Sequence, residues 1–341
     1  MKFYSSFQID NRAVGENAPV YIVAEAGVSH FGDEEKALRL VDLAVEAEAD
    51  AVKFQVFDID ALFSVELSEW RERLGPRQLS YDAFCRIRSY CLDKGITFFA
   101  TAHDEPSLEF LSGLHVPAFK VGSGEVGNWR FLRKVASLGK PLFFSTGMYR
   151  QDQISKALQV IEATGNKQVA VLHCVTRYPT PPDEVSLGNI ALIHKKYGVI
   201  TGYSDHTSGY HFPLAAAALG ARIIEKHISL DFNVPNAQDW KVSCGPDDFR
   251  KFIRQVREIE AGLKARVNGP TSGEIDNLSW AGKSLVAARD ISAGATIRSE
   301  DIATKRAGGG GIPPYCIDDV IGRKAKQHIL RDKTINWEQL Q

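Results

Sequence analysis

Eight short runs of apolar residues recur between residues 21 and 228, and a segment with helical periodicity follows each of them. The runs cover residues 21–27, 51–55, 96–101, 118–123, 141–147, 169–174, 199–204 and 222–228. Strands that are apolar almost throughout are typical of a parallel sheet that is covered on both faces. Eight strand and helix repeats fit a (β/α)8 TIM barrel better than an open doubly wound sheet. The sequence therefore predicts an α/β fold built on a closed barrel.

Local signals mark the ends of several predicted helices. Asp33 provides an N-cap that is followed by acidic residues, and residues 37–45 place their apolar side chains on one face. A helix is predicted over residues 81–94, because Gly95 is the kind of residue that commonly ends a helix. A long helix over residues 246–263 completes the series.

The pattern changes after residue 266, where turn residues replace helical periodicity. Short alternating runs then begin at Lys283 and are interrupted by glycine and proline. We therefore predict a barrel domain over residues 1–268, a linker over 269–282 and a small domain over 283–341. The glycines at 308–311 match no phosphate-binding motif, so a flexible turn and a close-approach loop at an active site both stay open.

Composition and charge argue against several functional classes. The formal net charge of −1 gives no field that would attract nucleic acid or an anionic membrane surface. The N-terminal residues lack the apolar segment of a signal peptide, and no run is long enough to span a membrane. The five cysteines are scattered without a Cys-x-x-Cys pair, which favours a reducing compartment. We expect a cytoplasmic protein without nucleic-acid or membrane partners.

Polar and charged residues stand at the end of every predicted strand. In a (β/α)8 barrel the carboxyl ends of the strands meet at one mouth, where catalytic groups collect. Each residue alone has a structural alternative: the serines can simply form turns, and the lysines can form ion pairs with Glu25 and Glu225. As a set they favour a functional site, because an unpaired buried charge costs about 3 kcal/mol or more. The residues are Glu25, Lys53, Gln55, Thr101, Lys120, Ser123, Ser145, His173, Tyr178, Asp205, His206, Glu225 and His227.

Two kinds of chemistry are represented in this set. The lysines and the hydroxyl groups beside glycines suit a phosphate with a neighbouring carboxylate. Two imidazoles, from His206 and His227, suit a divalent metal that keeps open coordination positions and acts as a Lewis acid. Glu25 is then a candidate general base or water-positioning group.

Motifs along the whole chain resemble the sialic acid synthase (N-acetylneuraminate synthase) family. The barrel part carries Val23-Ala-Glu25-Ala-Gly27, Phe119-Lys120-Val-Gly-Ser-Gly-Glu125, Tyr178-Pro-Thr-Pro181, Ser204-Asp-His206-Thr and Glu225-Lys-His227. The C-terminal part, with Ala288-Arg-Asp-Ile-Ser-Ala-Gly294 and Lys305-Arg306-Ala-Gly-Gly-Gly-Gly-Ile312, is similar to the antifreeze-like (SAF) domain of those enzymes.

The resemblance implies a reaction and a set of roles. The reaction condenses phosphoenolpyruvate with an N-acyl-mannosamine-type sugar to a nine-carbon 3-deoxy keto acid plus phosphate. His206 and His227 would hold Mn²⁺ or Mg²⁺, and Glu25 would activate or orient water. It further implies a domain-swapped homodimer in which Arg306 reaches the sugar. Phosphoenolpyruvate would be bound by Lys53, Thr101, Lys120, Ser123 and Ser145, with Gln55 and Tyr178 nearby, and the sugar or metal side by Glu125, Glu225 and Asp239.

The chain departs from the family pattern at Ser29, Phe31, Trp240 and Ala307. None of these is a proposed metal histidine or phosphate-binding lysine, so the reaction is better specified than the acceptor. A 6-deoxy diacetamido sugar, as used for legionaminic or pseudaminic acid, stays open. Two other hypotheses are a barrel aldolase and a non-catalytic sugar-binding protein.

Overall fold

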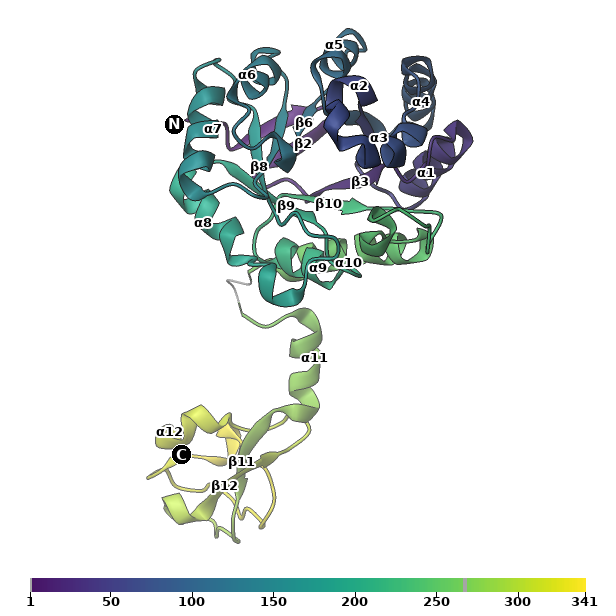
Figure 1. The fold of residues 1–341 in the computed structure, drawn as a ribbon. Helices are drawn as coiled ribbons and strands as arrows, with labels where there is room; N and C mark the ends of the chain where they lie inside the picture. The colour runs from purple at the N-terminus through teal and green to yellow at the C-terminus, as the bar shows by residue number, and fades with distance from the viewer. Residues whose placement is uncertain (1, 266–268) are drawn as a thin grey trace. The chain divides into compact units, whose positions relative to one another are not determined.

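The computed structural model describes residues 2–265 and 269–341, which divide into two compact units, Met1–Lys264 and Ala265–Gln341. In the first unit eight parallel strands close into a barrel in the order β10-β3-β4-β5-β6-β7-β8-β9 (Figure 1). The predicted TIM barrel is confirmed. Its strands are β3 (Tyr21–Gly27), β4 (Ala51–Val56), β5 (Thr97–Ala102), β6 (Phe119–Val121), β7 (Leu142–Ser145), β8 (Val169–Cys174), β9 (Ile200–Asp205) and β10 (Ile223–His227).

A helix follows each barrel strand and covers its outer face (Figure 1). The helix signals in the sequence act as expected, since the Asp33 side chain accepts from two backbone N–H groups of α1 and Gly95 ends α4 in the left-handed conformation with φ 73°. The covering helices are α1 (Glu34–Glu46), α4 (Tyr81–Lys94), α5 (Glu105–Gly113), α6 (Trp129–Ser137), α7 (Gln151–Glu162), α8 (Gly188–Tyr197), α9 (His211–Ala218) and α10 (Pro246–Gly262).

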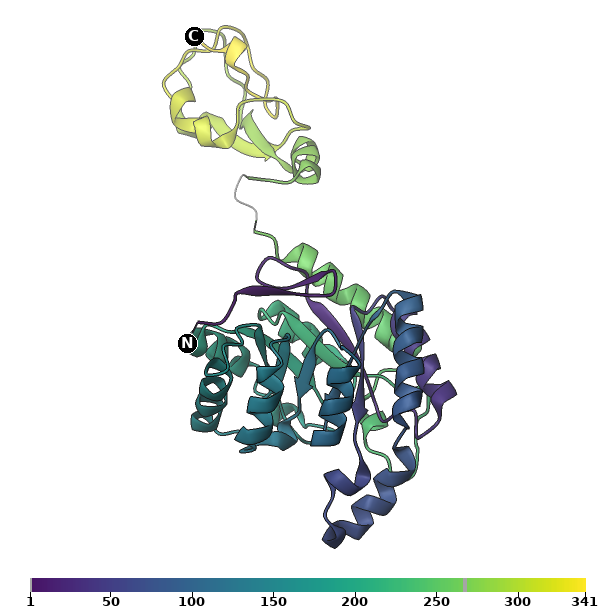
Figure 2. The same cartoon turned by 90° about the horizontal axis from the view of Figure 1, so that it is seen from above.

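An N-terminal hairpin closes one end of the barrel. Its strands are β1 (Ser6–Ile9) and β2 (Arg12–Gly15). Phe7, Ile9 and Val14 pack in one buried cluster with barrel residues such as Phe99 and Phe143. Figure 2 shows the hairpin at one end of the barrel and the segment between β4 and α4 at the other end. The open mouth is therefore at the carboxyl ends of the strands.

The segment between β4 and α4 carries two short helices, α2 (Ile59–Leu62) and α3 (Ser68–Leu74), and a 3-10 turn over Gly75–Arg77. Arg71 holds the segment together, because its guanidinium donates to the carbonyls of Ile59 and Phe63 and pairs with Asp60.

The second unit contains α11 (Ser272–Ala281), the antiparallel pair β11 (Lys283–Ala287) and β12 (Ile302–Arg306), and α12 (Ile317–Val320). Its own core gathers residues such as Leu285, Ile297 and Ile335. The predicted linker, 269–282, contains helix α11, and the missed signal is a capping box between Thr271 and Glu274. The predicted boundary at residue 268 lies outside the described residues.

Two expectations from composition can be compared with the structure. All five cysteines are free. Within residues 2–265 and 269–341, no helix is both long and apolar enough to cross a membrane.

Candidate active site at the barrel mouth

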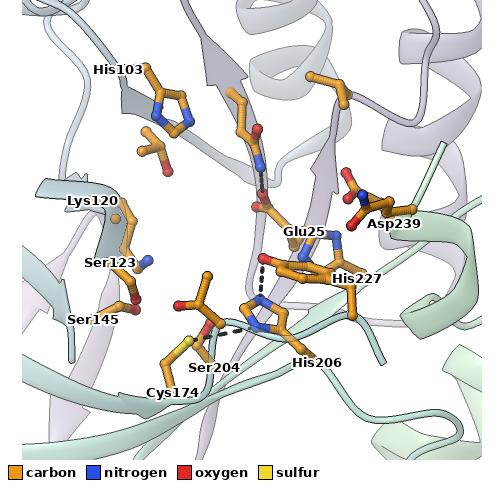
Figure 3. A pocket seen from close by; sticks show the side chains of 18 of the residues that line it. Glu25, His103, Lys120, Ser123, Ser145, Cys174, Ser204, His206, His227 and Asp239 are labelled. Carbon is orange, nitrogen blue, oxygen red and sulfur yellow. Dashed lines mark hydrogen bonds between the residues drawn. The ribbon is translucent and has the colours of Figure 1, made fainter. Parts of the chain in front are cut away.

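A cavity of about 440 Å³ opens at the carboxyl ends of the barrel strands (Figure 3). It gathers twelve of the sixteen residues proposed from the sequence. They are Glu25, Lys53, Gln55, Thr101, Lys120, Ser123, Ser145, Tyr178, His206, Glu225, His227 and Asp239.

Lys53 lies at the centre of a buried polar network. Its ammonium nitrogen is 2.7 Å from a carboxylate oxygen of Glu25 and 3.5 Å from one of Glu225, and it donates to the hydroxyl of Thr101 at 3.0 Å. The Gln55 amide donates to the other oxygen of Glu25 at 3.1 Å. Burial raises the pKa of Glu25, and Lys53 acts against that rise. Glu25 is thus held in place by two donors and has a pKa displaced toward neutrality, as a general acid or base requires.

Lys120 shares Glu225 with Lys53. Its ammonium nitrogen is 3.5 Å from Glu225 Oε1, which also accepts from the hydroxyl of Ser204 at 2.8 Å. Burial alone would raise the pKa of Glu225, but Lys120 and Lys53 together hold it well below its usual value. The structural alternative for the lysines, ion pairs with Glu25 and Glu225, is therefore present as well. Because Lys120 shares its carboxylate partner, Glu225, with Lys53, its ammonium group remains available to an anionic ligand.

Hydroxyl and imidazole groups beside Lys120 lack internal partners. The Ser145 hydroxyl and His103 Nε2 are buried without a hydrogen-bond partner among residues 2–265 and 269–341, while Ser123 Oγ accepts from the backbone N–H of Gly147 at 3.0 Å. A Cβ at Gly147 would lie 2.6 Å from that Ser123 oxygen, so only glycine allows this approach. Buried donors without partners in a cavity that contains a lysine favour an anionic ligand, because unsatisfied polar groups are costly.

His206 and His227 face each other across the cavity, with ring centroids 5.4 Å apart. The Tyr178 hydroxyl lies 2.8 Å from His206 Nε2, and its ring stacks on that imidazole at 4.0 Å. His227 Nδ1 is buried without a partner. Burial, together with His206 and Lys53, lowers the pKa of His227 well below its usual value, so the imidazole is neutral.

This pair fits a divalent cation. A neutral imidazole is the form that binds metal, and His227 is in that form, with an Nδ1 that has no hydrogen-bond partner among the described residues. Burial acts to lower the pKa of His206, but Cys174 and the Val175 carbonyl raise it, and its Nε2 lies beside the Tyr178 hydroxyl. Within the part of the chain that the structure describes, no group of three or more His, Cys, Asp or Glu side chains is arranged to hold a metal. The protein would therefore supply two imidazoles, and water or substrate would fill the other positions, as in catalytic sites.

The cavity also contains residues that the sequence analysis did not select. Arg73 and Arg77 come from α3 and the following turn, whose position no local pattern indicates. Cys174 could have been found from strand parity, the alternation of inward-facing and outward-facing side chains along a strand. Ala170 and Leu172 face the barrel interior, so Cys174 does too. The other additional residues are Val28, Trp70, Leu74, His103, Gly122, Gly124, Thr176, Ser204 and Gln238.

The same parity explains why two selected strand-end residues lie elsewhere. His173 follows the inward-facing Leu172 and points out of the barrel, where its Nε2 lies 2.7 Å from the Val185 carbonyl. Asp205 forms a buried ion pair with Lys226. Their selection as mouth residues was wrong.

Two sugar-side residues also lie outside this cavity. The Glu125 carboxylate accepts from Asn128 at the start of α6. Arg306 belongs to the second unit, where its guanidinium lies 5.3 Å from the ring centroid of Trp280.

Asp205→Ala is expected to destabilise the barrel by about 3–5 kcal/mol, because it leaves the Lys226 charge buried and unpaired. Chemical denaturation of the barrel measures this loss. The surface pair between Arg250 and Glu46 provides the control, since Glu46→Ala removes an exposed contact of about 1 kcal/mol or less. Equal effects of the two variants would contradict a structural role for the buried pair.

His30, next to two of the departures from the family pattern, is expected to titrate far below an ordinary histidine. Burial, and secondarily Arg77, lowers its pKa to about 4. Between pH 6.5 and 4 the unfolded chain binds the additional proton, so stability should fall as pH falls, by up to about 3 kcal/mol. Urea unfolding at several pH values measures the slope, and His30→Gln should reduce it. An NMR titration with a pKa near 6.5 would contradict the assignment.

Comparison with known proteins identifies the family. The model of the NeuB family matches residues 40–268, which is more than half of the chain, over the barrel that carries this cavity. The chain belongs to the NeuB family. The SAF domain matches residues 282–341, so the predicted C-terminal domain type is also confirmed.

Named NeuB-family relatives make sugar acids of the sialic acid type. The N,N'-diacetyllegionaminic acid synthase of Campylobacter jejuni is 33% identical over 92% of this chain and 98% of its own length. The N-acetylneuraminate-9-phosphate synthase of Mus musculus is 33% identical over 97% and 95%. A crystal structure of N-acetylneuraminic acid synthetase from Leptospira borgpetersenii has a TM-score of 0.75, with 31% identity over 81% of this chain and 96% of that one. The expected synthase class is confirmed, and the acceptor sugar is not fixed by these relatives.

Proposed function

We propose that this NeuB-family chain condenses phosphoenolpyruvate with an N-acyl-mannosamine-type sugar and water to give a nine-carbon 3-deoxy keto acid and phosphate. The observation that supports it most is one cavity that holds an anion pocket around Lys53 and Lys120 together with the neutral His227 beside His206. The non-catalytic alternative does not account for Glu25, whose raised pKa and two donors suit proton transfer.

The anion pocket would hold phosphoenolpyruvate. Lys53 and Lys120 supply positive charge, and Thr101, Ser123 and Ser145 supply hydroxyl groups around the phosphate or carboxylate. This places the enol carbon beside the histidine pair. A barrel aldolase would need a lysine with a free amine as its nucleophile. The two candidates, Lys53 and Lys120, both lie near the carboxylate of Glu225.

A divalent cation, Mn²⁺ or Mg²⁺, held by His206 and His227 would supply a Lewis acid that polarises the open-chain aldehyde. The enol carbon of phosphoenolpyruvate forms a bond to the aldehyde carbon, whose oxygen takes up a proton. Positive charge develops at the carbon that carries the phosphate. Glu25, held by Lys53 and Gln55, orients a water molecule there and accepts its proton. The bond between that carbon and the bridging oxygen then breaks, phosphate leaves with the electron pair, and the added hydroxyl passes its remaining proton to the departing phosphate and becomes the keto oxygen.

The test is an incubation of the full chain with phosphoenolpyruvate, Mn²⁺ and a panel of acceptors that includes N-acetylmannosamine and 6-deoxy diacetamido sugars. We expect phosphate release that depends on one acceptor and equals the amount of condensed product by mass. Release of pyruvate without condensation, or no phosphate with any acceptor, would contradict the proposal.

We also propose that the chain acts as a domain-swapped homodimer in which the SAF domain of one subunit completes the site of the other through Arg306. Arg306 is exposed within its own unit, which leaves it available. Lys120→Ala and Arg306→Ala should each lower activity strongly alone. Mixing the two variants after partial unfolding and refolding should restore part of the activity, because a mixed dimer contains one intact barrel with one intact Arg306. No recovery on mixing would contradict the swap.

A further inference from the structure

One wall of the cavity is built from a segment that the proposed reaction has not used. Helix α3 and the turn after it contribute Trp70, Arg73, Leu74 and Arg77 to the lining. The two arginines lie four residues apart and both reach the cavity.

The two guanidinium groups converge on one backbone carbonyl. Arg73 Nε and Arg77 Nη2 each donate to the Asn236 oxygen at 2.7 Å. Arg73 also stacks on Trp70, with its guanidinium carbon 4.8 Å from the ring centroid. These contacts fix two positive charges side by side at the edge of the cavity.

Neither charge is neutralised by an ion pair. Among residues 2–265 and 269–341, no carboxylate oxygen lies within 4.0 Å of either Arg73 or Arg77. Arg71 on the same helix differs, because it pairs with Asp60. Each guanidinium has five N–H donors and uses one on Asn236, so most donors remain free for a planar anion.

Two departures from the family pattern support this pair of arginines. Phe31 lies beneath Arg77, with the guanidinium carbon 5.3 Å from the ring centroid. Trp240 donates from Nε1 to the Val234 carbonyl, which braces the loop that contains Asn236. The residues that distinguish this chain on the sugar side are therefore part of the scaffold that positions the two cations.

The arginines lie at the sugar end of the cavity. Asn236, their shared partner, precedes Asp239 by three residues. Burial raises the pKa of the Asp239 carboxyl, and His206, Arg77 and Arg73 act against that rise, so both arginines lie near enough to act on Asp239 electrostatically. Figure 3 shows Asp239 on one side, Lys120, Ser123 and Ser145 on the other, and Glu25, His206 and His227 between them. A sugar with its aldehyde carbon at the histidine pair and its chain directed away from the phosphoenolpyruvate pocket would bring its terminal carbon toward Asp239.

We propose that Arg73 and Arg77 form an anion-binding subsite that selects an acceptor with a negative group, a phosphate or a carboxylate, on its terminal carbon. This inference rests on the proposed synthase function. A guanidinium group can form two parallel hydrogen bonds to a phosphate or to a carboxylate, so experiment decides which of the two groups the acceptor carries.

The experiment compares three acceptors that differ only at C6: N-acetylmannosamine, its 6-phosphate and its 6-carboxylate. For the full chain with Mn²⁺, kcat/KM is expected to be about 10-fold to 100-fold higher for one anionic acceptor than for the neutral one. Arg73→Gln with Arg77→Gln should abolish that preference, mainly by raising the KM of the anionic sugar, and should leave the KM of phosphoenolpyruvate unchanged. Arg133→Gln, which removes an exposed arginine of α6, controls for loss of charge.

Calorimetric binding of each sugar without phosphoenolpyruvate separates the subsite from the reaction. Tight binding of an anionic sugar that the double variant loses, without turnover of any acceptor, would support the subsite and overturn the proposed reaction. Turnover of neutral N-acetylmannosamine at least as efficient as that of both anionic sugars would overturn the subsite and leave the reaction standing. A rise in the KM of phosphoenolpyruvate in the double variant would also overturn it, because the arginines would then serve the other substrate.

Discussion

His227→Ala should lower kcat at saturating substrates by about a thousandfold or more. The proposed Lewis acid polarises the aldehyde and is expected to stabilise the transition state by about 4 kcal/mol or more. His227 is buried and neutral, and its Nδ1 has no hydrogen-bond partner among the described residues, so its replacement removes one of the two proposed metal ligands. Steady-state kinetics over a range of Mn²⁺ concentrations measure the effect. We expect a weaker apparent metal affinity together with the lower kcat.

His173→Ala is the matched control for this prediction. His173 is a buried histidine on β8, which is separated from β10 by β9, but it points away from the barrel interior and contacts the Val185 carbonyl. Its replacement should cost stability and leave metal dependence unchanged. Wild-type turnover by His227→Ala, or turnover of the unmodified chain that resists chelators, would contradict the metal assignment.

Lys120→Ala should lower kcat/KM for phosphoenolpyruvate by about 100-fold to 1000-fold, since a buried charge-assisted contact to a phosphate is worth about 3 kcal/mol or more. The KM of the sugar should change little, because Lys120 lies on the side of the cavity away from Asp239 (Figure 3). The fold should survive, since Glu225 keeps its contact with Lys53 and its hydrogen bond from Ser204.

Lys134→Ala provides the control for Lys120. Lys134 pairs with Glu105 on the outer surface and belongs to helix α6, which follows the strand that carries Lys120. Initial rates at varied phosphoenolpyruvate and fixed sugar distinguish the two variants, and thermal unfolding checks that both are folded. If Lys120→Ala raised the KM of the sugar as much as that of phosphoenolpyruvate, the division of the cavity into two ends would be wrong.

The barrel could be predicted from the sequence because its signals are periodic and local. Continuous apolar runs, caps such as Asp33 and a left-handed Gly95 each depend on near neighbours in the chain. The hairpin β1 and β2 was missed, since its short strands have few apolar residues and their role depends on burying Phe7 and Val14 against distant strands.

The site residues were predictable to the extent that strand parity determines them. Inward-facing positions continue the interior layers formed by residues such as Val23, Ala51 and Ile223, which places Glu25, Lys53, Gln55, Glu225 and His227 in the cavity. Strand ends alone do not separate these from outward-facing residues, and His173 and Asp205 were selected for that reason. Arg73 and Arg77 could not be predicted as cavity residues, because their convergence depends on a contact with Asn236 across about 160 residues of chain.

The account predicts which bond of phosphoenolpyruvate breaks, and an isotope measurement tests this directly. Phosphoenolpyruvate labelled with ¹⁸O at the bridging position is incubated with the chain, Mn²⁺ and the accepted sugar, and the released phosphate is analysed by mass spectrometry. Cleavage between carbon and the bridging oxygen, after water adds at the carbon, leaves the label in the phosphate. Phosphate without ¹⁸O, with the label in the keto acid or in pyruvate, would show attack at phosphorus and would contradict the proposed reaction.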